Sequence, residues 1–224
     1  MAVVSASEAK KYFSYPTFLK WFTYSILLFA ASAYLATQQH IQNAWYGVVF
    51  FMLLALILFF TGMRDVPSDE DIEETYANYA NKAVEKAINS LNLSRDDLVR
   101  ETDWFWYASW GIKDYPKRYR EGKDKEIRAN TRSFLLILYA ANQIMTYEVD
   151  YNIEANVESK ANNSEWFYKD VVGVEVTTDD LFILRTSGGA KEFPLKKQGS
   201  DDVADEERAR NVMNSIRSML REKK

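Results

Sequence analysis

The chain has 224 residues, of which 28 are Lys or Arg and 32 are Asp or Glu, so its formal net charge is −4 at pH 7. It contains no cysteine, which excludes disulfides, thiolate catalysis, zinc ribbons and iron–sulfur clusters. The single histidine, His40, is expected to be solvated, because one imidazole rarely holds a metal alone. We therefore predict neither a metal site nor a cofactor.

Residues 18–63 contain two long apolar segments, about 20–37 and 44–62, joined by a short uncharged connector. At ~1.5 Å per residue, the second is long enough to cross a hydrocarbon core of ~30 Å. The first is less apolar, but Leu27, Leu28, Phe29 and Leu35 favour its insertion. The sequence therefore predicts an N-terminal transmembrane helical hairpin. Aromatic residues near the segment ends are expected to anchor it at the lipid headgroups, namely Trp21, Tyr24, Tyr34, Trp45 and Tyr46.

The charges around this hairpin predict its orientation. Lys10, Lys11 and Lys20 precede the first segment, Arg64 follows the second, and the connector has neither Lys nor Arg. The positive-inside rule then places both termini in the cytoplasm. We expect a multi-pass protein of the inner (plasma) membrane, with residues 1–17 as a short cytoplasmic tail and the main domain in the cytoplasm.

The chain after residue 63 is acidic. Residues 1–63 hold three lysines and one glutamate, which leaves 25 basic and 31 acidic side chains and a net charge of −6 for the remainder. Because phosphate contacts need a positive field, we expect no nucleic-acid partner.

Residues 68–100 are predicted to form linker helices. Ser68 and Asp71 have the spacing of a capping box, so a helix should begin at Asp69 and end near Asn92. Its narrow apolar stripe, which includes Tyr76 and Tyr79, fits packing on the chain's own domain or an interhelix seam, and we favour the first. A second cap at Ser94 predicts another short helix.

Residues 104–112, WFWYASWGI, form the densest aromatic cluster of the chain. Such a cluster is typical of a core, and exposed rings would instead anchor a partner. The candidate surface for a partner or for self-association consists of Tyr76, Tyr79, Trp104, Trp106 and Trp110.

Residues 113–132 are the only positive run, with eight basic and four acidic side chains. We favour a solvated hairpin with Gly122 at its turn. The alternative is a patch that contacts lipid headgroups or a partner through Lys117, Arg118, Arg120, Lys123 and Lys125.

The remaining sequence predicts an antiparallel sheet and a closing helix. Residues 134–139 form a buried run, and residues 147–154 alternate between an apolar and a polar face. The segment 165–175 adds one or two strands, and two further strands, 181–186 and 190–195, meet across Gly188 and Gly189. The last helix is expected to carry the apolar stripe Ala209, Val212, Met213, Ile216 and Leu220.

The stretches SFLLILYAANQIMTYEVDY, EWFYKDVVGVEV and LFILRTSGGAKEFPL, followed by this helix, resemble bacterial pleckstrin-homology-like (PH-like) domains. The preceding AINSLNLSRDDLVRE is similar to linkers of uncharacterised two-helix bacterial membrane proteins that carry such a domain. The resemblance implies an α+β membrane protein in which a PH-like antiparallel barrel or sandwich, residues 101–224, is closed by the C-terminal helix. It also implies a noncatalytic and often oligomeric domain, with no catalytic residues to transfer.

Three functions fit these observations. We favour a nonenzymatic membrane-tethered scaffold or accessory subunit that presents the domain to a protein partner or to further copies. The alternative is a small oligomeric pore or transporter accessory protein built on the hairpin, although neither segment has an intramembrane ionisable residue. An enzyme would have to use carboxylate pairs such as Asp179 with Asp180 or Asp201 with Asp202, and adjacent acids usually mark turns and helix starts.

Overall fold

A computed structural model describes residues 3–38, 49–50, 52–53, 56–57, 66–107, 109, 111–195 and 205–223. The chain divides into two compact units. One is Val4–Ser68, and the other comprises Met1–Val3 and Asp69–Lys224.

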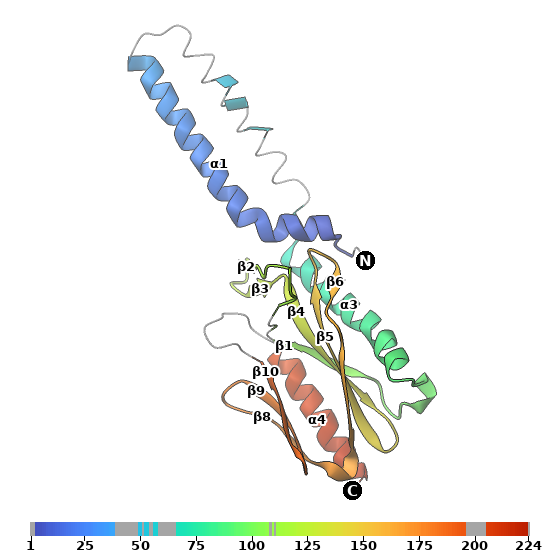
Figure 1. Ribbon diagram of the computed structural model, residues 1–224. Coiled ribbons are helices and arrows are strands. Elements are labelled where there is room, and N and C mark those ends of the chain that lie inside the picture. The colour runs from blue at the N-terminus through green and yellow to red at the C-terminus, as the bar shows by residue number, and fades with distance from the viewer. Residues whose placement is uncertain are drawn as a thin grey trace. The chain divides into compact units, whose positions relative to one another are not determined.

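The first unit contains α1 (Ala6–Gln38) (Figure 1). Its start is fixed by a reciprocal cap, in which the Ser5 N–H donates to Glu8 Oε2 at 2.8 Å and the Glu8 N–H donates to Ser5 Oγ at 3.3 Å. The side chains of Tyr24 and Tyr34 are exposed on this helix.

The structure contradicts the predicted transmembrane hairpin. Among the residues described, no helix combines the length and the apolar character needed to cross a membrane. Helix α1 is long, but Ser, Thr and Tyr residues interrupt its apolar run. The inner-membrane location depended on that hairpin and is corrected with it. The lipid bilayer as partner, the anchoring role of Tyr24 and Tyr34 and the pore alternative relied on the same hairpin, and the described residues do not test them. Trp45 and Tyr46 lie outside the described residues, and of Trp21 only its place in α1 is described.

The second unit is an α+β domain with antiparallel sheets. It begins with α3 (Asp69–Ser90), which confirms the predicted start at Asp69, and a 3₁₀ turn η1 (Arg95–Asp97). The larger sheet has the order β1-β4-β5-β6, with β7 also paired to β5. Its strands are β1 (Asp103–Tyr107), β4 (Thr131–Tyr139), β5 (Gln143–Asn152), β6 (Val157–Glu158) and β7 (Asn162–Phe167).

A smaller sheet of order β10-β9-β8 follows the 3₁₀ turn η2 (Tyr168–Asp170). It consists of β8 (Val171–Val176), β9 (Leu181–Thr186) and β10 (Gly189–Pro194). The predicted hairpin between the last two strands is confirmed, and Gly189, with φ +147°, meets the positive-φ demand of its turn. The chain closes with α4 (Glu206–Lys223).

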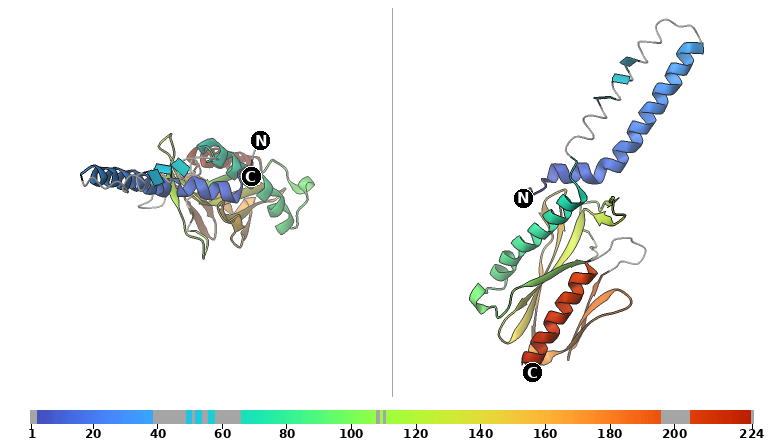
Figure 2. Two further views of the ribbon diagram at one scale, coloured as in Figure 1. Left: turned by 90° about the horizontal axis from the view of Figure 1, so that it is seen from above. Right: turned by 180° about the vertical axis from the view of Figure 1, so that it is seen from behind.

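The hydrophobic core lies between the two sheets and α4. Phe105, Leu135 and Ile137 from the larger sheet meet Phe182 from the smaller one and Ile216 from α4. Figure 2 shows α4 running beside the strands that it covers. The buried side chains of α4 include Ala209, Val212, Ile216 and Leu220, as the apolar stripe predicted.

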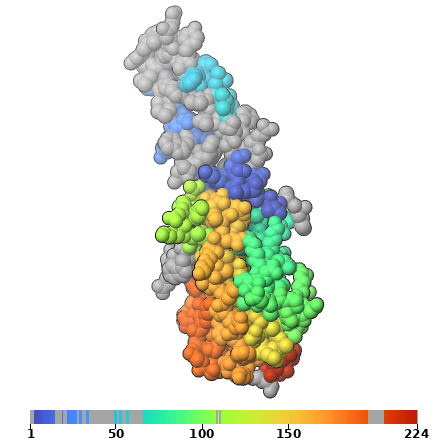
Figure 3. Space-filling model, turned by 45° about the vertical axis from the view of Figure 1, so that its right-hand side comes forward, coloured from blue at the N-terminus to red at the C-terminus, as the bar shows by residue number. Residues whose placement is uncertain are grey.

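Helix α3 covers the opposite face of the larger sheet. The ring of Tyr79 stacks on that of Tyr151 with 3.8 Å between centroids, and Asn163 Nδ2 donates to Ser90 Oγ at 2.8 Å. An ion pair joins Lys86 of α3 to Glu158 of β6. Figure 3 shows α3, in green, forming one surface with the neighbouring strands, in yellow and orange.

The predicted polar face of β5 is wrong as a solvent-facing surface. Asn152 is buried and Glu148 and Asp150 are half-buried. The reason is that both faces of β5 are covered. Helix α3 covers one face, and the smaller sheet lies on the side of the other face. Ser133 and Ser109 donate their hydroxyls to Asp150, which satisfies this carboxylate in its partly buried position.

Candidate functional site

Strand β1 is an edge strand whose sequence DWFWY places alternate side chains on opposite faces. Phe105 and Tyr107 are buried in the core. Trp104 and Trp106 therefore share the other face, where both are half-buried. Part of the predicted aromatic cluster is thus core, and part is a tryptophan surface.

The indole of Trp106 covers a buried arginine. The guanidinium carbon of Arg132 lies 3.9 Å from the Trp106 ring centroid and 4.3 Å from that of Tyr76, and Arg132 is only 2% exposed. An arginine between two rings gains cation–π attraction and loses its hydration, so it needs a carboxylate partner.

Glu73 of α3 supplies that carboxylate. Arg132 Nη1 donates to Glu73 Oε2 at 2.6 Å and Nη2 donates to Oε1 at 2.7 Å. The equally buried Arg128 donates its Nε to Glu73 Oε1 at 2.8 Å and its Nη2 to Asp124 Oδ2 at 2.6 Å. Burial raises the pKa of Glu73, but the hydrogen bonds and charge of Arg132, followed by those of Arg128, outweigh it and hold that pKa below its usual value.

Trp104 separates two hollows of the surface. Its ring lies 6.2 Å from that of Phe134, and the Arg208 guanidinium of α4 covers it at 3.8 Å. It lines a cavity of about 540 Å³ towards α3 and another of about 430 Å³ towards α4.

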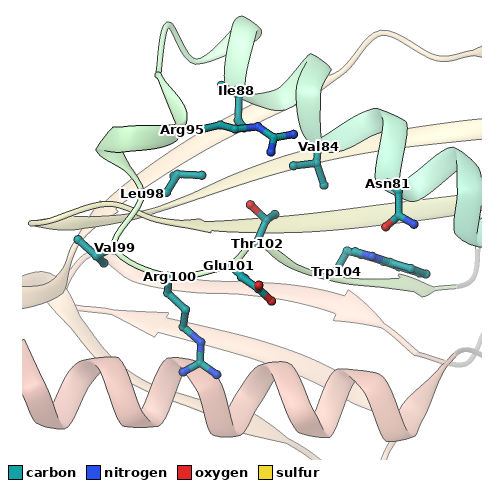
Figure 4. A pocket seen from close by; sticks show the side chains of 10 residues that line it. All are labelled: Asn81, Val84, Ile88, Arg95, Leu98, Val99, Arg100, Glu101, Thr102 and Trp104. Carbon is teal, nitrogen blue, oxygen red and sulfur yellow. The ribbon is translucent and has the colours of Figure 1, made fainter.

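The larger cavity is lined by apolar and by charged side chains (Figure 4). Val84 and Ile88 come from α3, and Leu98 and Val99 come from the segment that leads into β1. Arg95, Arg100 and Glu101 contribute the charges. A third cavity, of about 340 Å³, lies beside Trp106 and is lined by Glu73, Glu126, Arg128, Arg132 and the start of α4 at Asp205, Glu206 and Glu207.

The remaining candidate residues of the aromatic surface lie elsewhere. Tyr76 and Tyr79 are buried residues of α3, and the Tyr76 hydroxyl donates to the Ala129 carbonyl at 2.8 Å. They therefore belong to the interior of the domain. Trp110 lies outside the described residues.

The positive run forms the predicted hairpin, with β2 (Tyr119–Glu121) paired to β3 (Ile127–Ala129) and Gly122 in the turn. Besides Arg128 and Arg132, two of the candidate cations of this run contact other parts of the domain. Lys117 Nζ donates to the Ser109 carbonyl at 2.9 Å, and Arg118 lies 3.6 Å from Glu154. The Lys123 N–H donates to Asp69 Oδ2 at 2.8 Å, Lys125 adopts φ +66° in the turn, and Arg120 lies in β2.

Sequence reasoning missed Glu73, Arg128 and Arg132 as members of this site. Glu73 is one of several acids in the first turns of α3, and both arginines belong to the positive run. The only local indication of the site in the sequence was the spacing of these two arginines, Arg128 and Arg132, which are four residues apart.

Among the described residues, no group of three or more His, Asp or Glu side chains is placed to hold a metal. Asp179 and Asp180 lie in the turn between β8 and β9, where Asp180 has φ +56°, and Asp201 and Asp202 lie outside the described part of the chain.

Comparison of the chain with protein-family models, curated proteins and solved structures finds no match. The resemblance to bacterial PH-like domains therefore stays a prediction.

Proposed function

We propose that this chain is a nonenzymatic scaffold or accessory subunit that holds a protein partner on the surface beside β1. The observation that carries the proposal is the position of Trp104, half-buried between cavities of about 540 and 430 Å³ and stacked on Arg208. Trp and Arg dominate the binding energy of protein interfaces, especially where a pocket lies next to the ring.

The surroundings of Trp104 favour a protein over a small molecule. Both cavities lie beside an edge strand, and the larger one combines apolar side chains with charged ones, as protein interfaces do. Among its apolar lining residues, Val99 is 49% exposed and accessible to a partner.

Site-specific photocrosslinking of the full chain in its native cells tests the proposal. Val99 is replaced by the photoreactive residue p-benzoylphenylalanine, and the matched control carries it in place of Val172, an exposed valine of β8. We expect one discrete adduct from position 99, none from position 172, and loss of the adduct when Trp104→Ala is added. Circular dichroism establishes that the Trp104→Ala chain is folded.

Two outcomes would contradict the proposal. The first is the same adducts at both positions, and the second is an adduct at position 99 that a folded Trp104→Ala chain retains in full.

A further inference from the structure

We infer that the partner inserts a segment bearing Lys or Arg into the cavity beside Trp106. The inference rests on the proposed function, because it names the chemistry of the partner that the β1 surface holds. Two independent features of this cavity lead to it, the balance of its charges and a buried donor without an acceptor.

The cavity lies between four elements of the domain. Glu73 comes from α3, Trp106 from β1 and Arg128 from β3, while residues 205–207 at the start of α4 close the remaining side. The Asp205 N–H donates to the Trp106 carbonyl at 3.4 Å, so the start of α4 lies directly against the edge of β1.

Carboxylates outnumber guanidinium groups in the lining, by five to two. Both arginines are already neutralised, Arg132 by Glu73 and Arg128 by Glu73 and Asp124.

The acids at the start of α4 are less evenly compensated. Asp205 pairs with Arg208 at 2.8 Å, and Glu206 pairs with Arg210 at 2.5 Å. Glu207 has no ion-pair partner within the described part of the chain, and Glu126 is 69% exposed with Arg128 at 3.4 Å. The lining of the cavity therefore carries a net negative charge, with Glu207 unpaired among the described residues, and this charge attracts and orients a cationic partner.

The buried donor is Arg132 Nε. Arg132 lines the cavity, and this nitrogen has no hydrogen-bond acceptor among the described residues. A buried N–H without an acceptor is costly, so an occupant that brings a carbonyl oxygen gains more than one that brings only positive charge. A peptide segment bearing Lys or Arg offers both a carbonyl oxygen and a positive charge. The two features together specify a basic peptide segment.

Fluorescence anisotropy tests the inference with the full chain and a labelled hexalysine peptide as the probe. The test variant is Glu126→Gln with Glu207→Gln. The control variant is Glu165→Gln with Glu192→Gln, which removes the same charge from exposed positions of β7 and β10. We expect hexalysine to bind the test variant about tenfold more weakly than the wild type, and the control variant to change the affinity by less than about threefold.

Spermine, a cation without carbonyl groups, serves as the competitor. We expect it to displace hexalysine only at concentrations at least about tenfold above those of unlabelled hexalysine. Equal weakening by both double variants would show a general charge effect and overturn the inference. Spermine competing as well as hexalysine would overturn the requirement for a peptide carbonyl.

The two proposals fail separately. A Trp104-dependent adduct at position 99 without hexalysine binding would leave the proposed function in place and reject the basic segment. Specific hexalysine binding without any adduct would reject the proposed function as the use of this surface.

Discussion

Glu73 and Arg132 are 59 residues apart in sequence and form a two-pronged ion pair, with N···O distances of 2.6 and 2.7 Å. The pair joins the first turns of α3 to the start of β4. Because Trp106 and Tyr76 enclose the same guanidinium, this ion pair positions the tryptophan of the candidate surface as well as the helix.

Removing the Glu73 charge should destabilise the domain. In the Glu73→Gln variant, Arg132 stays buried without a counter-charge, so we expect the free energy of unfolding to fall by about 2–3 kcal/mol. This loss is smaller than that for a fully buried ion pair, because the Glu73 side chain is 36% exposed. Urea denaturation of the full chain measures the change. Glu165→Gln, at an exposed position of β7, should stay within about 0.5 kcal/mol of the wild type. A loss no larger than that control would show that the pair contributes nothing.

The same carboxylate should add to acid sensitivity. Its pKa is lowered in the folded protein, so its contribution is present above its unfolded pKa of about 4.3 and is lost as the pH falls through the folded value. We expect the difference in unfolding free energy between the wild type and Glu73→Gln to shrink steadily below pH ~4.3. Urea denaturation at several pH values tests this, and a difference independent of pH would contradict the pKa direction.

Asp150 should show the opposite pH dependence. Burial raises its pKa, and the hydroxyls of Ser133 and Ser109 offset only part of that effect. The folded state then binds a proton more readily than the unfolded state, so protonation favours folding. Relative to Asp150→Asn, the wild type should gain stability as the pH falls through the folded pKa towards about 3.9. A relative loss of stability over this range would show that the hydroxyls dominate.

The two tyrosines of α3 provide a matched comparison of buried hydroxyls. Tyr76 donates to the Ala129 carbonyl at 2.8 Å, whereas the Tyr79 hydroxyl has no hydrogen-bond partner among the described residues. We expect Tyr76→Phe to cost about 1–2 kcal/mol of unfolding free energy. Tyr79→Phe keeps the stack on Tyr151 and should cost less than about 0.5 kcal/mol or stabilise the protein. Calorimetric or urea unfolding of both variants decides, and equal losses would refute the distinction.

Much of the domain could be predicted because its signals are local. The acids in the first turn of α3, the apolar stripe of α4 and the paired glycines at the start of β10 each depend on residues a few positions apart. The aromatic cluster at residues 104–112 favoured a core, and it is the strand geometry of β1 that places Phe105 and Tyr107 inside and Trp104 and Trp106 on the other face. The predicted transmembrane hairpin is the main error: polar residues interrupt the apolar run of α1, and no described helix is long and apolar enough to cross a membrane. Most of the second predicted segment, 44–62, lies outside the described residues.

The sequence by itself determined α3, α4, the hairpin of β9 and β10, the acidic charge of the domain and the concentration of aromatic rings near residue 104. Only the tertiary structure decided which rings are interior, that both faces of β5 are covered, and that Arg132 lies between Trp106 and Tyr76 with Glu73 as its partner. The physical reason is the distance along the chain over which each interaction acts. Backbone periodicity and capping act over a few residues, whereas the burial and pairing of a charge depend on which distant elements meet around it.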